Sequence, residues 1–154
     1  MDDRSVREKE AYDSQHVHLK SYSYQSILSH CKIYYSQYIM NLIGNILSDA
    51  EGKKVLEIGS NTWYYWICLN NIKPEEIVCI NISENGISRG IQRGKKVNLN
   101  IKFRIMDANN LEFEDGEFDI VYGGQILHHL NFSRALAEIY RVLKKMAKLF
   151  LESP

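Results

Sequence analysis

The chain has 154 residues, 45% hydrophobic and 25% charged, which is typical of one globular domain with a substantial core. Nineteen basic and nineteen acidic side chains cancel, so the overall charge favours neither nucleic acid nor a membrane surface. No run approaches the ~18 apolar residues of a membrane span, and the charged N-terminus is unlike a signal peptide. We therefore expect no nucleic-acid partner and no membrane partner.

The first 52 residues divide into two segments. Residues 1–20 are polar and charged, so we expect their first residues to fray. Residues 21–52 are expected to form a helical cap, because apolar side chains recur at three- and four-residue steps between Ile27 and Ile46. Aromatic residues at this spacing are typical of core packing. The alternative is a lid over a ligand pocket, with a tyrosine hydroxyl facing the ligand.

Strands alternate with helices from residue 53 to residue 154, which predicts an α/β fold with a doubly wound parallel sheet. Ligands bind such sheets at the carboxyl ends of the strands, so the residues that follow each strand are the candidate site. The expected strands cover residues 53–58, 77–82, 101–106, 118–122 and 147–151, and the expected helices cover 63–71, 83–97 and 132–145. In the second helix, glycines at positions 86, 90 and 94 share one face and indicate close packing against the sheet.

The first strand end, in the stretch KKVLEIGSNTW, organises the rest of the domain. Gly59 can adopt a positive φ or let a ligand approach the backbone. Ser60, Asn61 and Thr62 can each cap the helix that follows. A dinucleotide-binding fingerprint has three glycines and this loop has one. Taken alone, the stretch fits a structural strand-turn-helix as well as it fits a binding loop.

The cysteines and histidines give little sign of a metal. The three cysteines are odd in number and far apart, which is typical of reduced thiols in a cytoplasmic protein. The sequence has no C-x-x-C pair, which would indicate a zinc site. We therefore expect a cytoplasmic protein without a metal site.

Three stretches carry a resemblance to a known family. VLEIGSNTW, INISE and MDANNLEFEDGEFDIVYGGQILHHL, the last followed by RALAEIYRVLKKMAKLFLESP, resemble the motifs of class I S-adenosylmethionine-dependent methyltransferases, of the methyltransferase-11/25 type. The resemblance covers residues 53–154. It implies a Rossmann-like sheet of about five strands in the order 3-2-1-4-5, preceded by N-terminal helices. It also implies truncation after the fifth strand, since the family's sheet usually has seven.

The resemblance implies a site for S-adenosylmethionine and its product S-adenosylhomocysteine. Glu57 would orient the Gly59 loop beside the methionine part, and Asn81 would stand where the family has an acidic residue on the ribose. Ile82 would pack on adenine, while Asp107 would accept a hydrogen bond from the adenine amino group. The implied cofactor-binding residues are Glu57, Gly59, Ser60, Asn61, Asn81, Ile82, Asp107, Ala108, Gly123, Gly124 and Gln125.

Other interpretations of single residues stay open. Asn81 fits a strand-end cap, and Asp107 fits a turn residue. Gly123 and Gly124 would border the sulfonium, and Gln125 or His129 would face the methyl acceptor. His129 is the implied catalytic base. However, adjacent histidines are expected to point apart, so at most one of His128 and His129 faces the site and a structural role fits equally well.

Two functions follow from the resemblance and its departures. The first is in-line methyl transfer to a small-molecule acceptor. The alternative is a degenerate module for cofactor binding or protein interaction, because the first loop lacks two glycines, Asn81 lacks a charge and strands are missing. An exposed fifth strand could then pair with another chain to form an oligomer. The run from Asp107 to Leu130 disfavours a nicotinamide-binding domain.

The turn before the last expected strand is a further departure. The family has Pro-Gly-Gly there, and this chain has Lys145-Met146-Ala147. A left-handed Met146 would cost ~1–2 kcal/mol.

Overall fold

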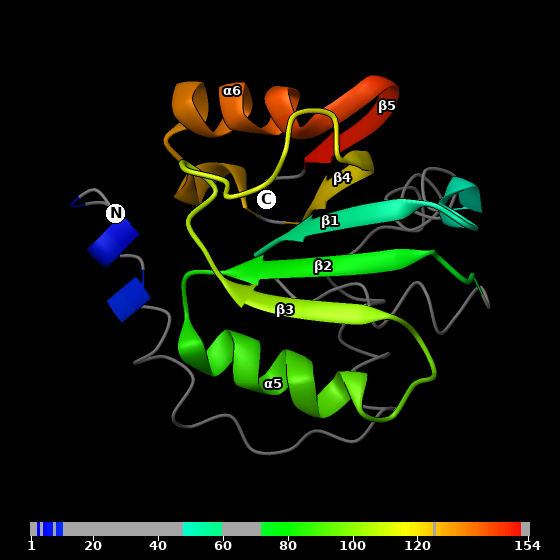
Figure 1. Ribbon diagram of the computed structural model, residues 1–154. Helices are drawn as coiled ribbons and strands as arrows, with labels where there is room; N and C mark the ends of the chain where they lie inside the picture. Colours follow the sequence, from blue (N-terminus) through cyan, green and yellow to red (C-terminus); the bar gives the residue numbers. More distant parts are fainter. Residues whose placement is uncertain are drawn as a thin grey trace, which may run out of the picture.

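The computed structural model describes residues 3, 5–7, 9–10, 48–59, 72–124 and 126–151. These residues form one sheet in which every neighbouring pair of strands is parallel (Figure 1). The strands stand in the order β3-β2-β1-β4-β5, so the predicted doubly wound sheet and its order are confirmed. Their bounds are β1 Lys54–Ile58, β2 Glu76–Asn81, β3 Ile101–Ile105, β4 Phe118–Gly123 and β5 Leu143–Leu151.

Parts of the predicted architecture lie outside the described residues. The helices expected within 21–52 and at 63–71 fall there almost entirely. A short turn of helix, η2 (Ser48–Ala50), leads into β1. The division into segments 1–20, 21–52 and 53–154 stays a prediction.

Helices cover both faces of the sheet (Figure 1). Helix α6 (Phe132–Val142) packs its buried residues, Ile139 among them, on Leu56 and the other strand residues of one face. The adjacent residue Val55 belongs to the opposite apolar cluster. Helix α5 (Glu84–Gly94) lies on that second side. The inner strands β1, β2 and β4 thus alternate between two buried faces, as the centre of a parallel sheet requires.

Helix α5 begins and packs as its sequence predicts. The Ser83 side chain caps it by accepting a hydrogen bond from the Gly86 backbone N–H at 3.0 Å. A Cβ atom at Gly94 would lie 3.0 Å from the Phe103 ring, so the expected close approach of helix to sheet is confirmed there. The helix ends at Gly94 and not at the predicted residue 97, because Lys95 and Lys96 turn the chain.

The last strand begins earlier than predicted. Helix α6 ends at Val142, whereas the sequence predicted a helix to residue 145 and a strand from 147. Leu143 instead pairs with Phe118, and the register then shifts so that Ile120 pairs with Lys148. The residues between form a bulge. Strand pairing at Leu143 therefore overrides a local run of good helix formers.

Met146 lies in this bulge with φ 69°, the one positive φ among the described residues other than glycine. Met146 therefore has the left-handed conformation whose cost is ~1–2 kcal/mol, and the strand pairing on either side of the bulge offsets that cost.

The two outer strands of the described sheet are β3 and β5. The first half of β5 carries Lys144, Lys145 and Met146 within the bulge. Lysines and bulges are devices by which sheet edges resist pairing with other chains. The expected oligomer through this edge stays a prediction. Among the described helices, none has the length and hydrophobicity to cross a lipid bilayer.

Candidate functional site

The carboxyl ends of β1 to β4 meet at one edge of the sheet, because these strands run parallel (Figure 1). The edge therefore gathers residues that lie far apart in the sequence. The described members of the predicted site are Glu57, Gly59, Asn81, Ile82, Asp107, Ala108, Gly123, Gly124 and His129. Ser60, Asn61 and Gln125 lie outside the described residues.

Gly59 and Gly123 face the same side chain, that of Ile126. Gly59 has φ 99°, a backbone conformation that favours glycine, and its N–H donates to the Ile80 carbonyl at 2.9 Å. A Cβ atom on Gly59 would lie 2.6 Å from Ile126 Cδ1, and one on Gly123 would lie 2.7 Å from Ile126 Cγ2. Ile126 thus fills the space between the ends of β1 and β4. The sequence did not reveal this role of Ile126, because no spacing rule distinguishes this isoleucine from its neighbours.

The Asn81 side chain ties β1 to the start of α5. Its Nδ2 donates to the Gly59 carbonyl, and its Oδ1 accepts from the Ser83 backbone N–H at 2.8 Å. Only 7% of the residue is exposed. The strand-end interpretation of Asn81 therefore describes its contacts in this structure, and a contact with ribose stays a prediction.

Glu57 is buried inside the sheet, with 1% of its surface exposed. The strand register places it between Cys79 on β2 and Tyr122 on β4. Burial raises the pKa of the Cys79 thiol well above its usual range, and the charge and hydrogen bond of Glu57 raise it further. The thiol therefore keeps its proton and interacts with the carboxylate. The predicted role of Glu57 in orienting the Gly59 loop stays a prediction.

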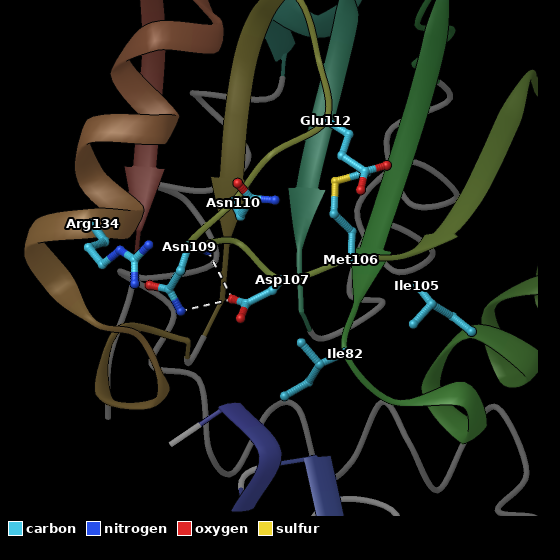
Figure 2. Close-up of a pocket in the computed structure, with 8 residues that line it drawn as sticks. All are labelled: Ile82, Ile105, Met106, Asp107, Asn109, Asn110, Glu112 and Arg134. Carbon is cyan, nitrogen blue, oxygen red and sulfur yellow. Dashed lines mark hydrogen bonds between the residues drawn. The ribbon is translucent and has the colours of Figure 1, made fainter. Parts of the chain in front are cut away.

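A cavity of about 500 Å³ lies beside the ends of β2 and β3 (Figure 2). Its volume is within the range of pockets that hold small ligands. Ile82 and Asp107, two of the three residues predicted to hold adenine, line it, and the third, Ala108, does not. The sequence predicts that the second strand ends at Ile82. In the structure β2 ends at Asn81, so Ile82 is the first residue after the strand. The full lining is Ile82, Ile105, Met106, Asp107, Asn109, Asn110, Glu112 and Arg134.

The Asp107 carboxylate makes a turn contact with one oxygen, and its contact with adenine stays a prediction. One oxygen, Oδ1, accepts from the Asn109 backbone N–H at 2.9 Å, which is the contact of a turn residue. In Figure 2 the second oxygen points away from Asn109, on the side of Ile82. The cavity therefore offers an apolar side chain and a carboxylate acceptor together, which fits a purine that carries an amino group. The adjacent Ala108 is buried.

The two histidines do not point apart as expected. They lie in a short 3-10 helix, η3 (Leu127–His129), and their ring centroids are 3.8 Å apart. The prediction that adjacent histidines on a helix or a turn point apart is therefore wrong for these two rings, whose planes lie 46° apart. His128 is exposed and His129 is half-buried. His129 does not line the cavity beside Asp107, so its catalytic role stays a prediction.

Metal ligands do not cluster in the described part of the chain. Within residues 48–59, 72–124, 126–151 and the described N-terminal residues, no three His, Cys, Asp or Glu side chains are placed to hold an ion.

Known proteins resemble this chain in sequence and in fold. A family model described as a methyltransferase domain matches residues 56–151. The chain belongs to the class I S-adenosylmethionine-dependent methyltransferases. It is 30% identical over 112 residues to the O-methyltransferase cnsE of Penicillium expansum, an alignment covering 71% of this chain and 41% of that protein. It is 32% identical over 124 residues to a ubiquinone/menaquinone biosynthesis C-methyltransferase of Rickettsia prowazekii, covering 71% and 44%.

The solved structures agree on the fold. A putative S-adenosyl-L-methionine-dependent methyltransferase of Methanococcus maripaludis matches with a TM-score of 0.65 at 19% identity. The match covers 88% of this chain and 65% of that one. This methyltransferase domain spans less than half the length of the two curated relatives above.

Proposed function

We propose that this methyltransferase domain binds S-adenosylmethionine at the carboxyl edge of its sheet and transfers the methyl group to a small-molecule acceptor. The observation that carries the proposal is the cavity shared by Ile82 and Asp107. Ile82 offers an apolar surface to adenine, and Asp107 offers an acceptor for its amino group. The Ala108 backbone N–H would donate to the ring. When bound, the cofactor supplies a methyl group already activated on a sulfonium.

The remaining residues would position the cofactor and acceptor. The loop that begins at Gly59, with Ser60 and Asn61, would hold the methionine part beside Glu57. Asn81 has a second N–H and further lone pairs, so its amide can contact the ribose without losing its bonds to the backbone. Positioning and exclusion of water would then provide most of the rate enhancement.

Gly123 and Gly124 would border the sulfonium, and Gln125 or His129 would face the acceptor. A histidine there would accept the proton that the methyl acceptor loses. The names of the matched relatives, an O-methyltransferase and a quinone-biosynthesis C-methyltransferase, support an acceptor of small-molecule size. The reaction would take place in the cytoplasm, where reduced thiols such as that of Cys79 persist.

One observation favours the second candidate, a degenerate module that binds cofactor without catalysis. Ile126 fills the space between Gly59 and Gly123 that a sulfonium would approach. A module of this kind would bind the adenosine part of the cofactor and leave no room for the reacting centre.

A transfer assay separates the two candidates. We expect the purified chain to move label from methyl-labelled S-adenosylmethionine to at least one member of a panel of demethylated quinones, phenols and amines. Asp107→Ala should lower this transfer about tenfold at limiting cofactor, because a hydrogen bond to a charged group is lost. Asp49→Ala removes an exposed carboxylate that pairs with Lys148, and this control should leave transfer unchanged.

The other outcomes are equally informative. Cofactor binding with no transfer to any acceptor would favour the degenerate module. Equal transfer by Asp107→Ala and the unaltered chain would show that Asp107 does not hold the cofactor.

A further inference from the structure

Asn109, which the sequence analysis did not select, holds the Asp107 carboxylate in place. Its backbone N–H and its side-chain Nδ2 both donate to Asp107 Oδ1, at 2.9 and 2.8 Å (Figure 2). Asn109 is 9% exposed and Asp107 is half-buried, so these bonds are partly shielded from water. Two donors on one oxygen fix the rotation of the carboxylate and leave its other oxygen toward the cavity.

Ser5, in the N-terminal segment, also contacts the Asn109 side chain. Asn109 Nδ2 also donates to Ser5 Oγ at 3.3 Å, and only 5% of Ser5 is exposed. In the same segment, Lys9 Nζ lies 4.0 Å from Glu84 Oε1 in the first turn of α5. Figures 1 and 2 show these helical residues beside the carboxyl edge of the sheet. The expected fraying of the first residues is therefore wrong for Ser5.

The Asn109 side chain also carries a buried acceptor. Asn109 Oδ1 is buried and makes no hydrogen bond within the described structure. Buried acceptors without partners are uncommon, and a bound donor is one way to satisfy them. Asn109 also lines the cavity. In Figure 2 Asn109 Oδ1 points to the side of Arg134 and away from Asp107. The acceptor on the Ile82 side is therefore the second Asp107 oxygen, which suits a purine with an exocyclic amino group and disfavours one with a carbonyl at that position.

We propose that Asn109, braced by Ser5, is a positioning residue that aims Asp107 at the amino group of the cofactor's adenine. The N-terminal segment is then part of the cofactor site, although it lies 104 residues away from Asn109 in sequence. The inference rests on the proposed function, because it concerns the same cavity. It adds residues that determine selectivity for the base.

The test compares two ligands on the full 154-residue chain. Calorimetry would measure the Kd of S-adenosylhomocysteine and of its analogue in which hydrogen replaces the exocyclic amino group. The unaltered chain should prefer the amino-bearing ligand about tenfold or more, the value of one hydrogen bond to a charged group. In Asn109→Leu this preference should fall below about threefold, because the carboxylate is free to rotate. Ser5→Ala should lower it to an intermediate value.

A matched control lies at the opposite end of β3. Asn100 Nδ2 donates to the Glu75 carbonyl at 3.2 Å on the exposed surface. Asn100→Leu makes the same chemical change away from the cavity, and it should keep the full preference. If Asn109→Leu does not fold by circular dichroism, Asn109→Asp provides a second variant. The aspartate side chain lacks the Nδ2 donor and its carboxylate repels Asp107, so the preference for the amino-bearing ligand should again fall.

Two results would overturn the proposal. The first is a preference unchanged in the Asn109 variants, which includes an equal loss of affinity for both ligands, as a merely structural role would give. The second is a lack of preference in the unaltered chain. A folded chain that binds neither ligand would instead refute the proposed function itself.

Discussion

Replacing Gly123 by alanine should lower the free energy of unfolding by about 2–3 kcal/mol, because the new methyl group has no room. It would lie 2.7 Å from Ile126 Cγ2, 3.0 Å from Leu151 Cδ2 and 3.3 Å from the Ile58 carbonyl oxygen. The branched atom of Ile126 sits next to its backbone, so rotation alone does not clear the contact. Urea unfolding followed by circular dichroism measures the change.

Gly59→Ala should destabilise the protein for a different reason. Its methyl group would meet Ile126 Cδ1 at 2.6 Å, the end of a side chain that can turn aside, but φ 99° remains unfavourable for alanine. We expect a loss of about 1–3 kcal/mol that comes mainly from the backbone.

A double-mutant cycle with Ile126→Ala tells these causes apart. The double variant Gly123→Ala/Ile126→Ala should be more stable than additivity predicts, by at least about 1 kcal/mol, because truncation removes the clash. Gly59→Ala/Ile126→Ala should be closer to additive. Additivity in both cycles would contradict the account of Ile126 as the side chain that fills this space.

Replacing Arg141 by leucine should cost about 2–3 kcal/mol, since the guanidinium joins α6 to the loop between β3 and β4. Its NH2 donates to the Leu111 carbonyl at 2.7 Å, and its NH1 donates to the Phe113 carbonyl at 2.8 Å. The same group binds Glu138 through Nε at 3.1 Å and NH2 at 2.9 Å, and Asp115 through NH1 at 2.8 Å. Arg141→Lys should recover less than half of the loss, because lysine lacks the planar fork.

The pH dependence of stability gives a second measurement on Arg141. Its hydrogen bonds hold the pKa of Glu138 below the ordinary value of 4.5, and the bond from the Leu111 N–H adds to this. A carboxyl whose pKa is lower in the folded state stabilises the protein above its unfolded pKa. That contribution is lost as the pH falls from about 4.5 through the folded pKa. Arg141→Leu should therefore show a smaller loss of stability on acidification than the unaltered chain. An equal loss in both would contradict the coupling.

The centre of the sheet was predictable because β1, β2 and β4 are short, largely apolar runs followed by turn residues. Runs such as those ending at Ile58 and Tyr122 can be buried on both faces only in a parallel sheet between helices. The start of β5 was not predictable, because Leu143, Lys144 and Lys145 continue the helical pattern of α6. The pairing of Leu143 with Phe118 of β4 is a tertiary interaction that local sequence does not encode.

The candidate site also has a part that the sequence predicts and a part that it does not. Gly59, Ile82 and Asp107 gather at one edge because parallel strands bring their ends together, and the order of the motifs is enough to predict this. Asn109 and Ser5 were missed, since their bond joins residues 104 positions apart through a segment whose polar composition gives no sign of burial. A loop contact of this kind depends on geometry alone.

The most direct test of the account is a calorimetric titration of the purified chain with S-adenosylhomocysteine, beside the Asp107→Ala variant. The account predicts micromolar binding by the unaltered chain and a loss of about tenfold in the variant, in which the adenine amino group loses its acceptor. A chain that is folded by circular dichroism and does not bind the ligand would contradict it, as would equal binding by the two proteins.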